Sequence, residues 1–361
     1  MKRNLISSLV FILFIFSNFY FLKCVKIKRI NYFVLKDKKS RDSDIRFLKW
    51  NKKNDEILLA IGFDYKIEIW NVTNKKIVYK IEPSGEENEK SEFVFLSWYA
   101  GTNNQLITFD SFSRLKIWNY DFHVFDFHVE EMLNHSLHLI KVKNILLHPS
   151  ENLFCSYSLN RNIMVWSIKN IKNNMMIKLI YLIKQRRDVM SMAWNCNNQD
   201  LFATVFNDGS IGIFNYKNGK CVKMLIDCYY KNHFEFIDIN WNYKNKDVLA
   251  VSYPDGNIEI WNCENGECFN SFMHSNSKKN NIGRTHVSWN PKYEHVIATF
   301  CENENCVKIW NTYNDKVQIL TKLEKLEGNV RCLSWNVDKP WLLCIGLNNG
   351  SVLVFEIKFV R

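Results

Sequence analysis

The sequence predicts an all-β fold made of seven repeats, and its tryptophans are the first observation that indicates it. Eleven of the 12 tryptophans fall into two series whose members are separated by about 48 residues or a multiple of that step. The first series comprises Trp70, Trp118, Trp166, Trp261 and Trp310, with Phe214 and Phe355 in its two gaps. The second comprises Trp50, Trp98, Trp194, Trp241, Trp289 and Trp335, with His148 in its one gap. Only Trp341 stands outside both series. A fixed period in this range is typical of a repeat architecture.

The residues around the first series indicate β-strands. In Ile258-Glu259-Ile260-Trp261, as in most members, an apolar, a polar, an apolar and an aromatic residue follow one another. This alternation suits a strand with one buried face. Several of these segments follow a dipeptide of the kind found in tight hairpins, namely Asp208-Gly209, Asp255-Gly256 and Asn349-Gly350.

Each repeat therefore contains four strands in order. Strand a ends in a residue of the second series, strand b and a tight turn follow, strand c carries a residue of the first series, and strand d completes the unit. Segments that fit strand d are Lys76 to Glu82, Cys221 to Ile226 and Val317 to Leu323. Four short antiparallel strands per period form one propeller blade, so the sequence predicts a single seven-bladed β-propeller over residues 25–361.

The two ends of the propeller region predict how the ring closes. The seventh repeat has strands a, b and c, but the chain ends at Arg361 before a strand d. Ile27 to Leu35 reads as an extra strand that lies before the first strand a, Ile45 to Asn51. Because natural sheets avoid an open edge, we expect Ile27 to Leu35 to pair beside Val352 to Lys358 and to complete the last blade.

On this pattern the chain resembles the WD40-repeat family over roughly residues 25–361. It departs from the family pattern in two ways. The Asp expected after the strand-c aromatic residue is Asn in five repeats, and the Gly-His usual before strand a is absent, with Gly328-Asn329 as its nearest equivalent. The five asparagines are Asn71, Asn119, Asn215, Asn262 and Asn311. The family's Asp–His–Ser/Thr–Trp hydrogen-bond network therefore cannot be assumed, and apolar packing between blades is expected to supply more of the stability.

Composition agrees with one large domain and indicates which classes of partner are favoured. The chain has 361 residues, of which 47% are hydrophobic, and a formal net charge of +11. This is ample for one closed propeller core. The charge allows a nucleic-acid or acidic-membrane partner, but the lysines are spread along the chain and no nucleic-acid-binding motif is present. Protein binding is therefore the favoured function, and a nucleic-acid-associated factor, as in ribosome biogenesis, is an alternative.

The 11 cysteines favour a reducing compartment. Their odd number and their places within predicted strands suit buried, reduced thiols, and hence a cytoplasmic or nuclear propeller. Two Cys-x4-Cys pairs occur, Cys263 with Cys268 and Cys301 with Cys306. Neither has a histidine at a spacing typical of zinc sites, so the sequence favours structural thiols and predicts no metal.

The first 24 residues form a hydrophobic N-terminal segment. Residues 4–22 carry no charge and are long enough to span a bilayer. Three interpretations are open: a signal anchor, a cleaved signal peptide, and an extension, or a misassigned start, foreign to the propeller. If the segment is an anchor, the basic residues that follow it place the propeller in the cytosol.

No motif in the sequence predicts catalysis. A Gly-rich phosphate loop, a Gly-x-Ser-x-Gly elbow and a His-Glu-x-x-His pair are all missing. The histidines before the third repeat, His123, His128, His135 and His138, fit a solvated loop better than a metal site. We expect no catalytic residue and no cofactor. A secreted or membrane-associated propeller hydrolase is the alternative from another class, and it would need carboxylates or metal ligands that converge on the central channel.

The resemblance implies a non-catalytic scaffold that binds other proteins within a multi-subunit complex. In such a ring, the d–a and b–c loops meet on one face, where loop side chains can vary without cost to the core. Arginine is enriched among residues that dominate binding energy. Four arginines fall at or near the starts of strand a and are the predicted interaction residues, on one shared face: Arg46, Arg187, Arg284 and Arg331.

Overall fold

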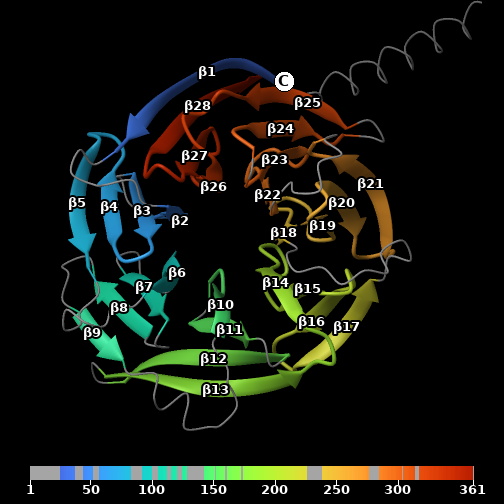
Figure 1. Ribbon diagram of the computed structural model, residues 1–361. Coiled ribbons are helices and arrows are strands. Elements are labelled where there is room, and N and C mark those ends of the chain that lie inside the picture. The colour runs from blue at the N-terminus through green and yellow to red at the C-terminus, as the bar shows by residue number, and fades with distance from the viewer. Residues whose placement is uncertain are drawn as a thin grey trace, which may run out of the picture.

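The described part of the chain folds into a ring of seven four-stranded antiparallel sheets (Figure 1). The computed structural model describes residues 25–36, 44–51, 57–82, 92–99, 105–111, 115–119, 124–127, 142–150, 152–158, 161–171, 174–225, 238–275, 284–302, 304–313 and 317–360. Every regular element among these residues is a strand. The prediction of an all-β, seven-bladed propeller is confirmed.

Within each blade the strands run a, b, c, d from the centre of the ring outward (Figure 1). Strands a are β2 (Ile45–Trp50), β6 (Phe93–Trp98), β10 (Val142–Leu147), β14 (Val189–Trp194), β18 (Asp238–Trp241), β22 (Thr285–Trp289) and β26 (Val330–Trp335). Strands b are β3 (Leu58–Phe63), β7 (Gln105–Asp110), β11 (Leu153–Ser158), β15 (Leu201–Phe206), β19 (Val248–Ser252), β23 (Val296–Cys301) and β27 (Leu342–Leu347). Strands c are β4 (Ile67–Asn71), β8 (Leu115–Asn119), β12 (Asn162–Ile171), β16 (Ile211–Asn215), β20 (Asn257–Asn262), β24 (Val307–Asn311) and β28 (Val352–Val360). Strands d are β5 (Lys76–Ile81), β9 (Val124–Phe127), β13 (Asn174–Lys184), β17 (Lys220–Leu225), β21 (Glu267–Met273), β25 (Gln318–Leu323) and, for the last blade, β1 (Lys26–Leu35).

The ring closes through the N-terminal strand. β1 pairs antiparallel with β28, with Leu35 opposite Val352 and Ile27 opposite Phe359. In Figure 1 the blue β1 lies along the outside of the red β28. The predicted clasp is therefore confirmed, and it gives the seventh blade the fourth strand that the C-terminal repeat does not contain.

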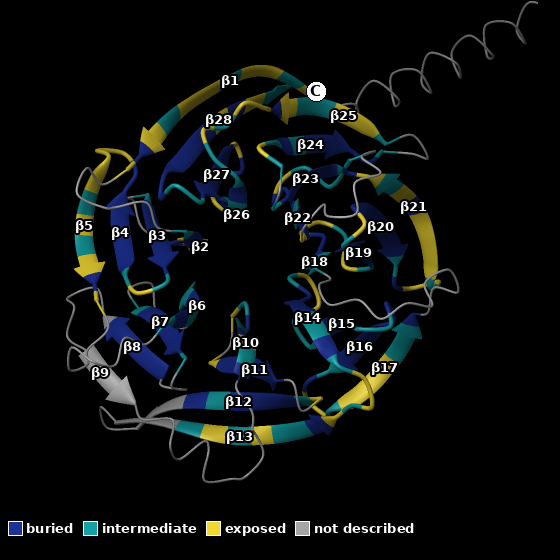
Figure 2. Ribbon diagram, in the orientation of Figure 1, coloured by how far each residue is buried: buried dark blue, intermediate teal, exposed yellow. Residues whose placement is uncertain are grey.

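The hydrophobic core lies between the blades. Seven clusters of buried apolar side chains can be distinguished among the described residues, one between each pair of adjacent blades. Strands b are buried along almost their whole length because a neighbouring blade covers each face, whereas strands d alternate between buried and exposed positions (Figure 2). The turn dipeptides behave as predicted: Gly209, Gly256 and Gly350 all adopt positive φ, which a side chain disfavours.

The second tryptophan series links each blade to the one before it. Five indole N–H groups donate to a main-chain carbonyl on strand a of the preceding blade at 2.9–3.2 Å: Trp50 to Ser334, Trp98 to Lys49, Trp194 to Leu146, Trp241 to Ala193 and Trp335 to Ser288. Trp289 is the exception, since its indole nitrogen is buried without an acceptor among the described residues. Ten of the eleven series tryptophans are buried, and Trp98 is partly buried, whereas Trp341 is 45% exposed.

The first series makes a different hydrogen bond, within its own blade. Three indole N–H groups donate to a side-chain hydroxyl on strand b: Trp118 to Thr108, Trp166 to Ser156 and Trp310 to Thr299. In two other blades a buried glutamate two residues earlier takes the place of the hydroxyl, as Glu68 does for Trp70 and Glu259 for Trp261.

Blade 6 contains the hydrogen-bond network that the sequence did not predict. His274, which directly follows β21, bonds through Nδ1 to Thr299 Oγ1 at 2.7 Å, and Thr299 accepts from Trp310. Glu304, 3.2 Å from His274 Nε2, stands where the family has aspartate. The histidine escaped notice because Met273, not glycine, precedes it, so that the expected Gly-His pair is not formed.

No helix among the described residues is long and apolar enough to cross a bilayer. The N-terminal segment of residues 1–24, to which the anchor and signal interpretations apply, lies outside the described residues, as do His123, His128, His135 and His138.

Replacing Trp241 with alanine should lower the free energy of unfolding by about 3–5 kcal/mol. Its side chain is 2% exposed and joins two blades by packing and by the bond to Ala193. Trp341→Ala, which removes the same atoms from an exposed position, should change the value by less than about 0.5 kcal/mol. Urea denaturation measures both, and equal losses in the two variants would contradict the packing role assigned to Trp241.

Candidate functional site

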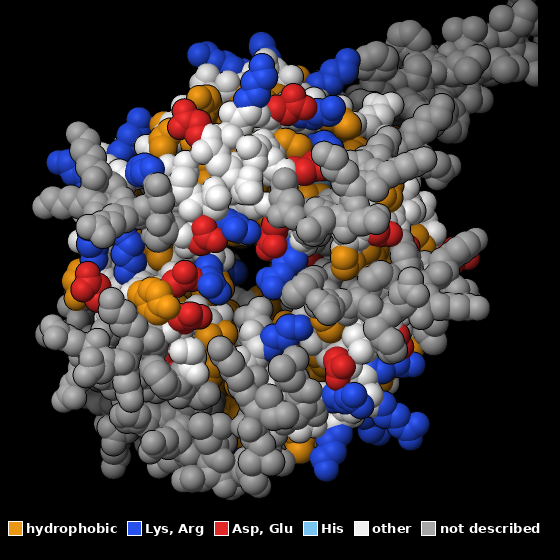
Figure 3. Space-filling model, viewed as in Figure 1, with side chains coloured by type: hydrophobic (Ala, Val, Ile, Leu, Met, Phe, Trp, Pro, Cys, Tyr) orange, Lys and Arg blue, Asp and Glu red, His pale blue; other side chains and the backbone are white. Residues whose placement is uncertain are grey.

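The starts of strand a meet around a charged cavity at one end of the central channel. This cavity, the channel mouth, has a volume of about 740 Å³ and is lined by residues of blades 1, 2, 3, 6 and 7. Around the central opening, Figure 3 shows Lys and Arg side chains interspersed with Asp and Glu. The charged lining residues are Asp44, Arg46, Glu92, Lys143, Arg284, His286, Glu302 and Arg331.

Three of the four predicted arginines line this cavity. Arg46 forms an ion pair with Asp64, in the b–c turn of blade 1. Arg284 lies 4.0 Å from Glu302, in the b–c turn of blade 6, and Arg331 lies 3.1 Å from Asp44, just before β2. The three belong to different blades and converge on one space.

The fourth predicted arginine lies at the same end of its blade but outside the cavity lining. Arg187 precedes β14 and pairs at 2.5 Å with Asp208, in the b–c turn of blade 4, while its guanidinium lies 5.9 Å from the centre of the Phe206 ring. All four arginine side chains are between 32% and 51% exposed. Ion pairs as exposed as these add little stability, so the carboxylates mainly orient cations that remain open to solvent.

His286 lies between two carboxylates at the mouth. Its Nδ1 lies 3.3 Å from Asp238 Oδ2 and its Nε2 lies 3.5 Å from Glu302 Oε1, while its ring stacks on Phe300. Burial alone would lower the pKa of His286, but the hydrogen bonds and charges of the two carboxylates outweigh it and raise the pKa to about 9. The imidazole is therefore protonated at neutral pH.

Two other groups at the mouth, Glu302 and Lys143, have lowered pKa values. Burial raises the pKa of Glu302, but the hydrogen bond and charge of His286, with Arg284 and Arg331, bring it below its ordinary value. Burial lowers the pKa of Lys143, and the charge of Arg284 lowers it further. The mouth is thus a set of fixed charges of both signs.

The opposite end of the channel has a different chemistry. A cavity of about 530 Å³ there is lined by the ends of strands a, including Trp50, Trp98, Trp194, Trp241 and Trp335. The channel is consequently charged at one end and aromatic at the other, because every strand a starts at the mouth and ends in a residue of the second tryptophan series.

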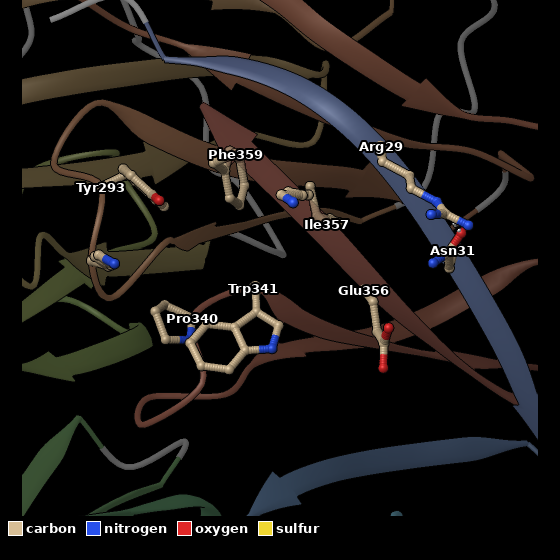
Figure 4. A pocket seen from close by; sticks show the side chains of 10 residues that line it. Arg29, Asn31, Tyr293, Pro340, Trp341, Glu356, Ile357 and Phe359 are labelled. Atoms are coloured by element: carbon tan, nitrogen blue, oxygen red, sulfur yellow. Dashed lines mark hydrogen bonds between the residues drawn. The ribbon is translucent and has the colours of Figure 1, made fainter. Parts of the chain in front are cut away.

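A third concave surface lies on the rim of the ring, beside the clasp. Arg29 of β1, Tyr293, Trp341 and Phe359 line a groove of about 380 Å³ (Figure 4). Trp341, the one tryptophan outside both series, is thereby explained as a surface residue of this groove.

Comparison with known proteins agrees with the repeat architecture. The family model described as the anaphase-promoting complex subunit 4 WD40 domain matches residues 196–292, from just after β14 to just after β22, which is two repeat periods. A chain from the crystal structure of the mitotic checkpoint complex superimposes with a TM-score of 0.66 over 92% of this chain and 91% of that chain, at 13% identity. The chain is a seven-bladed β-propeller, and a WD40-domain model matches two of its repeat periods.

A curated relative matches a shorter part of this WD40 propeller. The histone-binding protein MSI1 of Saccharomyces cerevisiae is 31% identical over 70 residues, which are 19% of this chain. The match spans only 16% of the length of that relative. The likeness at 13% identity to the checkpoint-complex chain shows the fold alone.

Sequence reasoning missed the partners of the arginines in this WD40 propeller. Asp238 and His286 stand 48 residues apart, one repeat period, so a strict alignment of strand-a starts places them in adjacent blades. It does not show that His286 contacts both Asp238 and Glu302, which comes from a b–c turn. No local signal identifies that contact.

The carboxylates at the mouth of the WD40 propeller are held by cations. Asp44 lies beside Arg331, Asp238 beside His286, and Glu302 beside both His286 and Arg284. The hydrogen bond and charge of His286, with the charge of Arg284, lower the pKa of Glu302, whereas a general acid needs a raised pKa. The geometry therefore suits charge recognition better than acid–base chemistry.

The stability of the WD40 propeller should depend on pH through His286. Its folded pKa of about 9 lies above the ordinary value of 6.5, so its contribution is fully present below about pH 6.5 and is lost as the pH rises through 9. Relative to His286→Gln, the wild-type free energy of unfolding should fall between pH 6.5 and 9. Chemical denaturation of both proteins across that range tests this, and parallel pH profiles would contradict a protonated His286.

Proposed function

We propose that this WD40 propeller is a non-catalytic scaffold that binds a partner protein at the channel mouth, through a segment that presents carboxylates. The observation that carries the proposal is the convergence of Arg46, Arg284 and Arg331 from three blades on one cavity, with protonated His286 beside them. Guanidinium groups bind carboxylates in a bidentate geometry that fixes orientation as well as charge.

The charges of the mouth favour some partners over others. The cationic lining side chains outnumber the acidic ones even without His286, so a few carboxylates on a partner can compete with Asp64 and Glu302 for the arginines. A continuous nucleic-acid backbone would bring its phosphates against Asp44, Glu92 and Glu302 as well, which disfavours it. A strongly basic segment would meet like charges.

The comparisons support a role in protein assembly. One similar protein is named a histone-binding protein, and another similar chain comes from the mitotic checkpoint complex. Neither partner is transferred to this chain, because the first match covers a small part of its relative and the second shows the fold alone. A basic histone segment is also disfavoured by the cations of the mouth.

The thiols support a reducing compartment, the cytoplasm or the nucleus. None of the nine cysteines among the described residues forms a disulfide, and burial raises the pKa of the thiols of Cys263, Cys301 and Cys332 to about 12. Such thiols are protonated and unreactive at neutral pH.

The experiment is affinity purification of the tagged full-length protein, followed by mass spectrometry. The triple variant Arg46→Ala, Arg284→Ala, Arg331→Ala should lose the main partner, with its affinity lowered at least about tenfold, which is about 1.4 kcal/mol. Arg187→Ala should lose less, because Arg187 lies outside the cavity.

The matched control removes three lysines from outer strands, Lys76→Ala, Lys220→Ala and Lys322→Ala, all on exposed positions. It changes the net charge equally and leaves the mouth intact. Retention of the partner by the mouth variant, or its loss from both variants alike, would contradict binding at the mouth. Hydrolytic activity of the purified wild type would contradict a non-catalytic scaffold.

A further inference from the structure

Blade 6 brings together four side chains that are ligands for soft and borderline metal ions. A ring nitrogen of His274, Cys301 Sγ and a carboxylate oxygen of Glu304 all lie within 4.8 Å of one another. Cys306 Sγ lies 3.4 Å from Glu304 Oε2 and 4.0 Å from His274 Nε2. These four residues are the blade-6 cluster.

The separations in the blade-6 cluster fit a tetrahedral ion. With zinc bonds of about 2.0–2.3 Å, the ligand atoms of a regular tetrahedron stand roughly 3.3–3.8 Å apart. His274 Nε2 is 3.2 Å from Glu304 Oε2, close to the lower end of that range. Cys306 Sγ is 3.4 Å from Glu304 Oε2, within the range, and 4.0 Å from His274 Nε2, slightly above it.

The fold fixes the orientation of the histidine. The His274 side chain has no exposed surface, and its Nδ1 is held by Thr299 Oγ1, which is itself held by the indole of Trp310. Nε2 thereby faces Glu304 and the Cys306 thiol. A hydrogen bond to the second ring nitrogen is the usual way in which proteins orient a metal-binding imidazole. In the bound form the imidazole proton lies on Nδ1, where Thr299 Oγ1 accepts it.

The charge of the site is also balanced. Two thiolates and one carboxylate around a divalent ion leave one negative charge, and Lys308, whose side chain is 12% exposed, lies 4.0 Å from Glu304. Its ammonium group can neutralise that excess in a region where an unpaired charge would be costly.

We propose that the blade-6 cluster is a zinc site, with His274, Cys301, Glu304 and Cys306 as ligands. One nitrogen, two sulfur and one oxygen donors suit Zn²⁺, whereas Mg²⁺ and Ca²⁺ select oxygen donors. Binding forms two zinc–sulfur bonds and releases the two thiol protons to solvent, while Glu304 is already ionised and the imidazole keeps its single proton. Affinity therefore rises with pH.

The position of the cluster links it to the channel mouth. Cys301 and Glu304 flank Glu302, which pairs with His286 and Arg284, and His274 begins the connection that leads to Arg284. An ion at this place would tie that connection to the b–c turn of blade 6. The inference itself does not depend on what binds at the mouth.

The test is metal binding by the full-length protein, read by cobalt(II) substitution and by competition of zinc with a chromophoric chelator. Wild-type protein should bind one ion at this site and show the near-ultraviolet absorption of a cobalt–thiolate bond. Cys301→Ser and Cys306→Ser should each weaken binding by more than about tenfold and reduce that absorption.

The matched control is Cys344→Ser, at a buried thiol in blade 7 whose bond to the Ser334 carbonyl a hydroxyl can replace. It should bind metal as the wild type does. If Cys301→Ser fails to fold, the partly exposed Cys306 still provides the test. Wild-type protein without a cobalt–thiolate band, or Cys306→Ser with unchanged affinity, would show that the cluster is only a hydrogen-bonded part of the fold.

Discussion

The pairing of β1 with β28 is the contact on which the rest of the ring depends. Each blade buries its apolar faces against two neighbours, so a ring with one incomplete blade would leave an open sheet edge and weaken the clusters on both sides of it. Leu35 and Val352, opposite each other in the clasp, both belong to the cluster between blades 7 and 1. The residues that close the ring are therefore also part of the hydrophobic core.

The closed ring explains why charged residues distant in sequence meet at the mouth. Every strand a starts at the same end of the channel, so the seven starts are brought side by side whatever residues occupy them. Arg331 therefore lies against Asp44, and His286 lies between Asp238 and Glu302. The tryptophans at the other ends of these strands carry the packing and leave the starts free to vary. This separation of core from recognition surface lets a propeller change partners without loss of stability.

Blade 6 shows how a structural network can acquire other chemistry. The chain from Trp310 through Thr299 and His274 to Glu304 satisfies buried polar groups, as the family network does. Here Cys301 and Cys306 stand beside it, and together they convert the end of a hydrogen-bond chain into a set of metal ligands. The same histidine can serve either role, because only the position of its proton differs.

The sequence by itself determined the number of blades, the strand order, the core tryptophans and the clasp. All of these follow from periodic and local patterns, since a strand's alternation and a turn's glycine act over a few residues. Arg46, Arg284 and Arg331 could also be placed at one end from the repeat alone. Only the tertiary structure decided their carboxylate partners, the protonation of His286 and the meeting of His274 with Cys306, 32 residues later. Those contacts join separate strands and turns, within one blade or between neighbouring blades, where the repeat imposes no spacing and side-chain direction is set by packing.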